Sequence, residues 1–205
     1  MSASLPTTDG GYACILADPP WSFLTYAGGK HDVGVTPHRC AEDHYATMNL
    51  NDLCALRVAD VAAPNACLFM WVVGSHIPDA IALAAPWGFS YKTDAFYWFK
   101  QKLIAADQID LFTSDIAAPR MGMGYWTRKQ VETCLLFTRG KPKRLSKGVR
   151  QAIIAPIREH SRKPDEQYER IEALCSGPRL ELFARRRRVG WDAWGNDVEK
   201  FGEAA

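Results

Sequence analysis

The sequence predicts a single α/β domain with a mostly parallel sheet flanked by helices. Residues 12–17 (YACILA) and 66–73 (ACLFMWVV) are short and almost continuously apolar, which is typical of strands buried on both faces. Segments with helical spacing of apolar side chains alternate with such runs, as in βαβ units. With 205 residues and 47% hydrophobic content, the chain is long enough for one well-buried core and short for two.

The expected elements follow from local patterns, taken in chain order. They are strand 12–17, helix 51–63, strand 66–73, helix 78–85, strand 90–100, strand 133–138, helix 164–174 and strand 179–184. Helix 51–63 has its apolar residues at helical spacing and has Asn51 or Asp52 as its expected N-cap. Helix 78–85 has Pro78 in its first turn, where proline is tolerated. For helix 164–174, Ser161 is the expected cap, and Asp165 and Glu166 are favourable charges at its N-terminus.

Three long segments do not fit this alternation and are expected to be loops. Residues 24–44 are rich in Gly, His and Thr, residues 102–123 are polar, and residues 141–161 are basic. Long loops in a compact domain are usually functional or mobile. His31, His38, Cys40 and His44 lie in the first loop, but their spacing matches no standard zinc pattern, so we expect no metal there.

The formal net charge is only +2, so attraction for a polyanion must come from local clusters. Two basic clusters exist, KPKRLSKGVR at 141–150 and RRRR at 185–188. Either cluster binds phosphates or is an ordinary solvated face; we expect the first cluster to lie near the ligand crevice at the carboxyl ends of the strands and to contact phosphates. The six cysteines form no CxxC pair, and several lie in apolar runs, which indicates free thiols in a reducing cytoplasm. No apolar run is long enough to cross a membrane.

The segment ADPPW, which ends strand 12–17, has the chemistry of a site for an aromatic amine. Asp18 falls at the carboxyl end of a strand, where ligands gather in parallel α/β sheets. Pro19 and Pro20 fix the turn and have no N–H, so we expect their carbonyls to escape local hydrogen bonds. Asp18 and a proline carbonyl can then accept from one NH2 group, while Trp21 offers a face for stacking. The alternative is a rigid turn with a buried tryptophan.

Further segments resemble the MT-A70 family of S-adenosylmethionine-dependent adenine N6-methyltransferases. They are ADPPW, YATM at 45–48, LFMWV at 68–72, WGF at 87–89, GYWTR at 124–128, EHSRKPDE at 159–166, LELFAR at 180–185 and GWDAWGN at 190–196. The resemblance implies a Rossmann-like methyltransferase fold in which the catalytic strand precedes the donor-binding strand. It also implies that Asp18, Pro19, Pro20 and Trp21 form the catalytic segment.

The resemblance implies the residues that bind the methyl donor. They are Asp18, Lys163, Glu181, Arg185 and Asn196. Carboxylates and amides can bind ribose hydroxyls, and a lysine or arginine can pair with the donor carboxylate. Glu181 lies in an apolar strand, so a buried carboxylate there needs a partner, either a donor hydroxyl or Lys163. Asn196 has the alternative of being a simple turn residue after Gly195.

The resemblance also implies an adenine pocket, lined by Trp21, Tyr45, Lys100, Trp126, Arg128 and Glu132. For Lys100 the alternative is a charge at a strand end, and for Trp126 and Arg128 it is a packed loop. A base within a duplex cannot reach such a pocket, so the adenine must be flipped out or single-stranded.

The function implied is methyl transfer from S-adenosylmethionine to N6 of adenine in DNA, with short or relaxed sequence specificity. DNA is favoured because small members of the family resemble bacterial or phage DNA modification enzymes. We therefore expect a cytoplasmic, nucleoid-associated enzyme, with a homodimer as one option. The alternatives are an RNA adenine N6-methyltransferase and a non-catalytic nucleic-acid-binding subunit of the same fold.

Overall fold

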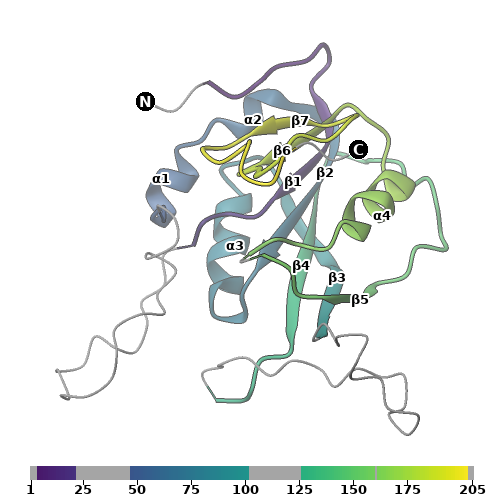
Figure 1. Cartoon of the computed structure of the whole chain (residues 1–205). Helices are drawn as coiled ribbons and strands as arrows, with labels where there is room; N and C mark the ends of the chain where they lie inside the picture. Colours follow the sequence, from purple (N-terminus) through teal and green to yellow (C-terminus); the bar gives the residue numbers. More distant parts are fainter. Residues whose placement is uncertain (1–3, 22–46, 102–125, 160, 203–205) are drawn as a thin grey trace, which may run out of the picture.

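The computed structural model describes residues 4–21, 47–101, 126–159 and 161–202, which form one sheet with helices on both sides (Figure 1). The elements, in chain order, are β1 (Tyr12–Ala17), α1 (Leu50–Cys54), α2 (Val58–Val61), β2 (Ala62–Val72), the 3-10 helix η3 (Gly74–His76), α3 (Ile77–Ala84), β3 (Ser90–Gln101), β4 (Val131–Arg139), β5 (Ala152–Pro156), α4 (Glu166–Leu174), β6 (Arg179–Leu182) and β7 (Asp192–Trp194). The sheet order is β5-β3-β4-β2-β1-β6-β7.

The strand directions confirm the predicted α/β class with a mostly parallel sheet. β1 is parallel to β2 and β6, β6 is parallel to β7, and β3 is parallel to β5. Only β4 runs against its neighbours β2 and β3. The strands other than β4 therefore end at one edge, called the carboxyl edge below, and β4 begins there. β1 precedes its neighbour β6 in sequence, which is the predicted strand order.

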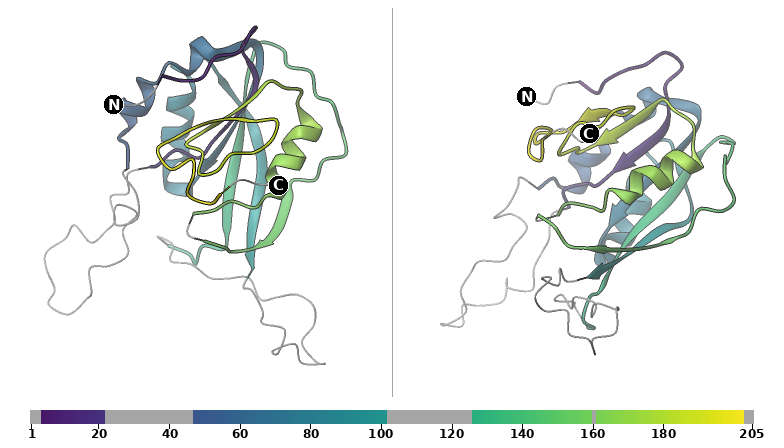
Figure 2. Two further views of the ribbon diagram at one scale, coloured as in Figure 1. Left: turned by 45° about the horizontal axis from the view of Figure 1, so that its top comes forward. Right: turned by 45° about the vertical axis from the view of Figure 1, so that its right-hand side comes forward.

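Two apolar cores cover the two faces of this sheet. One face packs against α1, α2 and α3 through residues such as Ile15, Leu68 and the fully buried Trp87. The other face packs against α4, with Leu16 and Trp71 contributing from the sheet. Figure 2 shows α4 and the α1–α3 group on opposite sides of the strands. Because both faces are covered, β1 and the second half of β2 are buried at nearly every residue, as their continuous apolar runs predicted.

The single helix expected over 51–63 is wrong. The structure has α1 and α2 with a turn between them, and the chain becomes extended at Ala62, which pairs with Tyr12 of β1. Strand pairing thus overrides the local helical spacing at the end of this segment. The N-cap is Asn49, whose side chain accepts from the N–H of Asp52 at 2.9 Å, rather than Asn51 or Asp52.

Other boundaries also differ from expectation. Helix α4 begins at Glu166 without a side-chain cap, so the expected Ser161 cap is wrong. The basic loop expected over 141–161 contains β5, and β7 was not predicted at all. Both are short edge strands that depend on pairing with one neighbour, which leaves little local signal. The loops expected over 24–44 and 102–123 lie outside the described residues.

Two further expectations concern thiols and membranes. The described cysteines (Cys14, Cys54, Cys67, Cys134 and Cys175) are all free, as predicted. None of the helices in the described part of the chain combines the length and the apolar content that a membrane span needs.

Two adjacent glycines at the start of β1 provide a stability test. Gly10 and Gly11 both have φ near +80°, but a Cβ on Gly10 would meet open space, whereas a Cβ on Gly11 would lie 2.7 Å from the backbone nitrogen of Ala63. We expect Gly10→Ala to lower the free energy of unfolding by about 1–2 kcal/mol, the cost of the left-handed conformation. Gly11→Ala should cost clearly more, because the backbone of β2 must also move. Urea denaturation measures both, and equal losses would contradict this account.

Candidate active site

The site begins where β1 ends, with Asp18 and the rigid turn that follows it. Pro20 O accepts from the N–H of Met48 at 2.9 Å, which ties the turn to the segment before α1. Pro19 O accepts from the N–H of Trp21 at 2.8 Å. The expectation that the proline carbonyls escape local hydrogen bonds is therefore wrong: the next N–H along the chain turns back onto Pro19. A carbonyl oxygen has two lone pairs, so Pro19 O can still accept a second hydrogen bond.

Trp21, at the end of the turn, is fixed by contacts with β2 and with His76. Its side chain is buried, its indole N–H donates to Trp71 O at 3.4 Å, and its ring lies stacked on His76 with centroids 5.5 Å apart and an interplanar angle of 8°. His76 in turn bonds Asp79 at 2.7 Å. The sequence reasoning missed His76, which follows β2 at the carboxyl edge. One face of Trp21 is thus already in contact with a ring of the protein.

A chain of alternating charges crosses the carboxyl edge of the sheet. Lys163 Nζ lies 2.6 Å from Asp18 Oδ2 and 3.5 Å from Glu132 Oε2. The other oxygen of Glu132 bonds the ammonium group of Lys100. These residues come from the end of β1, the loop before α4, the start of β4 and the end of β3. The structure therefore brings together residues that the sequence had assigned to donor binding and to the adenine pocket.

Burial and charge act against each other in this chain. Burial raises the pKa of Glu132, but Lys163 and Lys100 outweigh it and hold that pKa at about 2. Burial lowers the pKa of Lys163, but Asp18 and Glu132 outweigh it and raise that pKa overall. The pKa of nearby Lys129 is lowered, chiefly by burial. Lys129 was missed by the sequence reasoning, since a lysine next to Arg128 reads as a surface charge. The shifted pKa values of Glu132 and Lys163 keep both of these side chains ionised at neutral pH.

The loop that carries Lys163 is itself held by arginines. Asp165 lies 2.6 Å from Arg158, 3.6 Å from Arg162 and in contact with Arg186. Arg158 also donates to the backbone oxygen of Lys163 at 2.9 Å. Asp165, which the sequence placed only as a favourable charge at a helix start, is thus the centre of an ion-pair cluster that fixes the position of Lys163.

A pocket opens beside this charge chain. Its walls come from β1, β2, the loop before α4, α4 itself, β6 with the residues after it, and the C-terminal segment. The lining residues are Leu16, Asp18, Trp71, Ser161, Arg162, Lys163, Gln167, Tyr168, Glu181, Phe183, Arg185, Arg186 and Phe201. Asp18, Lys163, Glu181 and Arg185 were all expected to contact one ligand, and the structure places the four around one hollow. Ser161 and Phe183 have φ of 63° and 61°, a conformation that is costly for residues other than glycine and that clusters at functional sites.

Glu181 has a partner that the sequence did not indicate. The hydroxyl of Tyr168, on α4, lies 3.0 and 3.1 Å from its two carboxylate oxygens. Lys163, the partner expected from sequence, is bonded to Asp18 and Glu132 instead. Burial raises the pKa of Glu181 to about 7, because one hydroxyl proton does not replace the water that a carboxylate loses.

Asn196 is placed differently from the other predicted donor-binding residues. It is exposed, lies in the turn after β7, and is not among the residues that line the pocket. The preceding Gly195 is tightly fixed, because a Cβ there would lie 2.7 Å from Ala184 O. In this structure, Asn196 therefore has the surroundings of a turn residue after Gly195, which is the alternative that the sequence left open.

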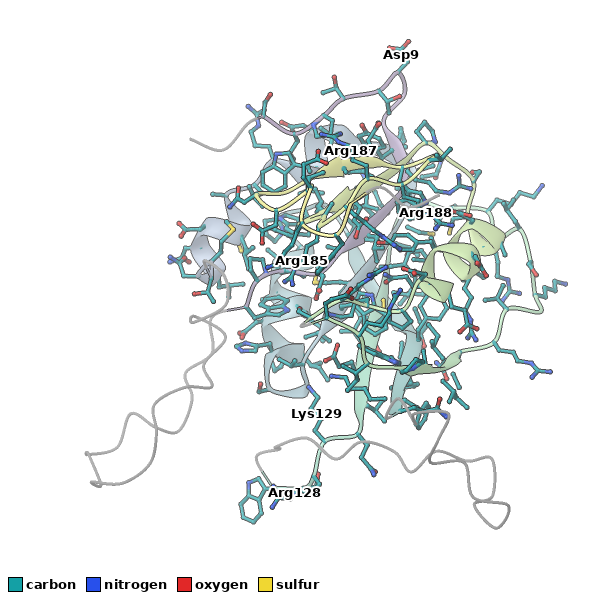
Figure 3. The ribbon with its side chains drawn as sticks, in the orientation of Figure 1. Asp9, Arg128, Lys129, Arg185, Arg187 and Arg188 are labelled. Carbon is teal, nitrogen blue, oxygen red and sulfur yellow. The ribbon has the colours of Figure 1, made fainter. Side chains whose placement is uncertain are left out.

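The RRRR cluster is used largely within the fold, as Figure 3 helps to follow. Arg186 contacts Asp165, Arg187 lies 2.9 Å from Glu199, and Arg188 lies 3.4 Å from Glu172. The guanidinium groups of Arg186 and Arg188 also lie over the ring of Tyr168. Arg185 faces the pocket. As a group these residues are thus not a solvated phosphate-binding patch.

The remaining predicted acceptor residues fall into three groups. Lys100 is half-buried in the charge chain, which excludes a solvated strand end. Trp126 is 91% exposed and Arg128 is exposed, so the packed-loop alternative is wrong. In Figure 3 Arg128 and Lys129 lie at the end of the molecule opposite Asp9, which precedes β1, and so beyond the carboxyl edge. Tyr45 and the histidines of 28–45 lie outside the described residues.

Known proteins with similar sequences match most of this chain. The MT-A70 family model matches residues 12–197. The Type II methyltransferase M.MunI of Mycoplasma sp is 32% identical over 202 residues, which are 91% of this chain and 78% of that protein. The N(6)-adenosine-methyltransferase catalytic subunit METTL3 of Homo sapiens is 28% identical over 198 residues, 93% of this chain but 29% of that protein. The Drosophila melanogaster MT-A70-like protein is also 28% identical, with 28% of its length matched.

The raised pKa of Glu181 predicts how stability depends on pH. Because the folded pKa of about 7 lies above the ordinary value of 4.5, the folded state binds the proton more tightly, and stability falls as pH rises from about 4.5 through 7. Glu181→Gln removes this loss, so its free energy of unfolding relative to wild type should rise by roughly 3 kcal/mol between pH 4 and pH 8. Urea denaturation across this range measures the difference. Glu169→Gln, on the exposed side of α4, is the control, and a pH-independent difference for Glu181→Gln would contradict the assignment.

Proposed function

Because the chain belongs to the MT-A70 family of adenine N6-methyltransferases, we propose that it transfers a methyl group from S-adenosylmethionine to N6 of an adenine in DNA. The observation that carries this proposal is the ion pair between Lys163 and Asp18 at the mouth of the pocket. It holds the Asp18 carboxyl group at the start of the rigid turn, next to the strand that carries Glu181. The family supports the reaction class, and this geometry supports the roles below.

Asp18 is proposed to orient the attacking amine. Its Oδ2 is engaged by Lys163, which leaves Oδ1 as an acceptor for one N6 proton, and the second lone pair of Pro19 O can take the other. Holding both protons directs the nitrogen lone pair, which is otherwise delocalised into the purine ring. Pro20 stiffens this arrangement because its carbonyl oxygen accepts a hydrogen bond from the N–H of Met48, and Trp21 fixes it through the hydrogen bond from its indole to Trp71 O. Catalysis is then positioning and electrostatics, and the N6 proton leaves to Asp18 or to solvent.

The pocket residues fit the proposed donor. Glu181 receives one hydroxyl hydrogen bond although a carboxylate can accept about four, so it has acceptor capacity for ribose hydroxyls. Lys163 donates one of its three N–H bonds to Asp18 and forms an ion pair with Glu132 at 3.5 Å, so it has donor capacity for a ligand. Arg185 adds a guanidinium for a carboxylate. When bound, S-adenosylmethionine supplies an electrophilic methyl on a sulfonium centre. Asn196 would reach the donor from the turn after β7.

The acceptor side is proposed to lie beyond the carboxyl edge. Glu132 and Lys100 border the position that the adenine would occupy next to Asp18, and Tyr45 would line it by its ring. The exposed Trp126 offers a face to a neighbouring base, and Arg128 a charge to a phosphate. The target adenine must be single-stranded or flipped out of a duplex to reach Asp18.

DNA is the proposed polymer because the chain is 32% identical to a Type II methyltransferase and 28% identical to the N(6)-adenosine-methyltransferases of Homo sapiens and Drosophila melanogaster. We further propose short or relaxed sequence specificity and a cytoplasmic, nucleoid-associated location. A homodimer is one option for the assembly, and the mass of the purified protein measured by sedimentation distinguishes it from a monomer.

The function is tested by transfer of labelled methyl from S-adenosylmethionine to matched single-stranded DNA, duplex DNA and RNA, followed by nucleoside analysis. N6-methyladenine should appear in DNA. Asp18→Asn should lower the rate at least about a hundredfold, because its amide oxygen would face the ammonium group of Lys163 and its NH2 group, which cannot accept a hydrogen bond, would face the amine. Asp192→Asn is the matched control: it keeps an acceptor for Tyr12, lies outside the pocket lining and should leave the rate unchanged.

The same preparations separate the alternatives. Label found only in RNA would overturn the choice of polymer. Absence of donor binding by calorimetry, together with an Asp18→Asn variant that leaves cellular methylation unchanged, would favour a non-catalytic subunit. Retention of the wild-type rate by Asp18→Asn, with donor binding intact, would remove Asp18 from the mechanism.

A further inference from the structure

The two basic clusters of the sequence differ in their ion pairing in the structure. The arginines at 186–188 are matched to carboxylates of the fold. The segment 141–150 holds five cations, all exposed: Lys141, Lys143, Arg144, Lys147 and Arg150. Within the described residues none of these five forms an ion pair, and the segment contains no acidic residue. A row of like charges without partners is costly for the folded state unless a polyanion is bound.

The backbone of this segment is fixed although it has no regular secondary structure. The N–H of Lys141 bonds Asn65 at 2.7 Å, the N–H of Leu145 bonds Leu174 O at 2.9 Å, and Arg150 O accepts from Arg170. Val149 packs against the core on the α4 face. Figures 1 and 2 show the segment as the green trace that runs outside α4, from the end of β4 to the start of β5. The cations are thus presented outward from an anchored chain.

The position of this segment relative to the pocket corrects one expectation. The sequence argument placed the basic loop near the crevice, but β4 is antiparallel to β2, so Lys141 begins at the edge opposite Asp18. The segment then returns along α4 to β5, whose end leads into the loop of Lys163. Five residues of β5 span about 17 Å. At about 3.4 Å per nucleotide, Arg150 lies roughly five nucleotides from the carboxyl edge.

We propose that residues 141–150 form a track for the phosphate backbone of DNA flanking the target adenine. This inference rests on the proposed function and adds to it the place and length of the substrate contact. Phosphates match the row of cations in charge, and flexible lysines suit contacts that carry no sequence information. The track binds DNA that extends beyond about five nucleotides from the target, and it contributes nothing to shorter substrates.

The test compares wild type with the triple variant Lys143→Gln, Arg144→Gln, Lys147→Gln, using fluorescence anisotropy without methyl donor. Two DNA probes carry a central adenine with flanks of about three or about fifteen nucleotides on each side, lengths chosen from the distance above. For the long duplex, the variant should lose at least about tenfold in affinity at roughly 0.1 M salt, and the slope of log affinity against log salt should fall by about 2–3. For the short probe, the KM for methylation, measured in a separate assay with S-adenosylmethionine present, should be unchanged.

The matched control is Arg57→Gln, Lys92→Gln, Lys200→Gln, which removes the same net charge from exposed positions outside the track. The proposal is overturned if the track variant binds the long DNA as tightly as wild type does, or if the control variant loses as much affinity. It is also overturned if the variant loses as much with the short probe as with the long one, or if the variant loses affinity only for long RNA. If the track variant binds long DNA normally and the wild type methylates DNA, only the proposal of a phosphate track is contradicted. Failure of wild type to methylate any nucleic acid defeats the proposed function instead, and anisotropy still reports on the track.

Discussion

The ion pair between Lys163 and Asp18 is the interaction on which the site depends. It joins the end of β1 to the loop before α4 at 2.6 Å, in surroundings where both side chains have lost most of their water. An ammonium group and a carboxylate tolerate such burial only together, since removal of one partner from a buried pair typically costs 3–5 kcal/mol. Lys163 also contacts Glu132, so its loss would leave two carboxylates facing each other. The pair therefore fixes both the Asp18 carboxyl group and part of the pocket wall.

The reversed direction of β4 explains how this charge chain is assembled. If β4 ran parallel to its neighbours, its first residues would lie at the opposite edge, and Glu132 could not meet Lys100 and Lys163. Because β4 starts where β1 and β3 end, three strands and one loop each contribute one charge. The same reversal sends the basic segment 141–150 to the far edge. One topological feature thus separates the chemistry from the proposed contact with flanking DNA.

The arginines show how local charge is divided between structure and function. Asp165 gathers Arg158, Arg162 and Arg186 and so positions the backbone of Lys163. Arg186 and Arg188 also stack on Tyr168, the residue that bonds Glu181. These contacts make α4 a support for the pocket rather than a separate layer. The arginines at 186–188 have carboxylate partners, whereas the five cations at 141–150 are exposed and form no ion pair within the described residues.

The sequence by itself determined the class of fold, the central strands, the position of Asp18 at a strand end and the family resemblance. These features are local, because a buried parallel strand needs a continuous apolar run and a rigid turn needs its prolines. Only the tertiary structure decided that Lys163 bonds Asp18 and Glu132, that Tyr168 bonds Glu181, and that His76 stacks on Trp21. Each of these pairs joins residues distant in the chain or on separate elements, so no spacing in the sequence encodes it. The short strands β5 and β7 also exist only through pairing with a neighbour, and burial of charge against charge is a property of the assembled fold.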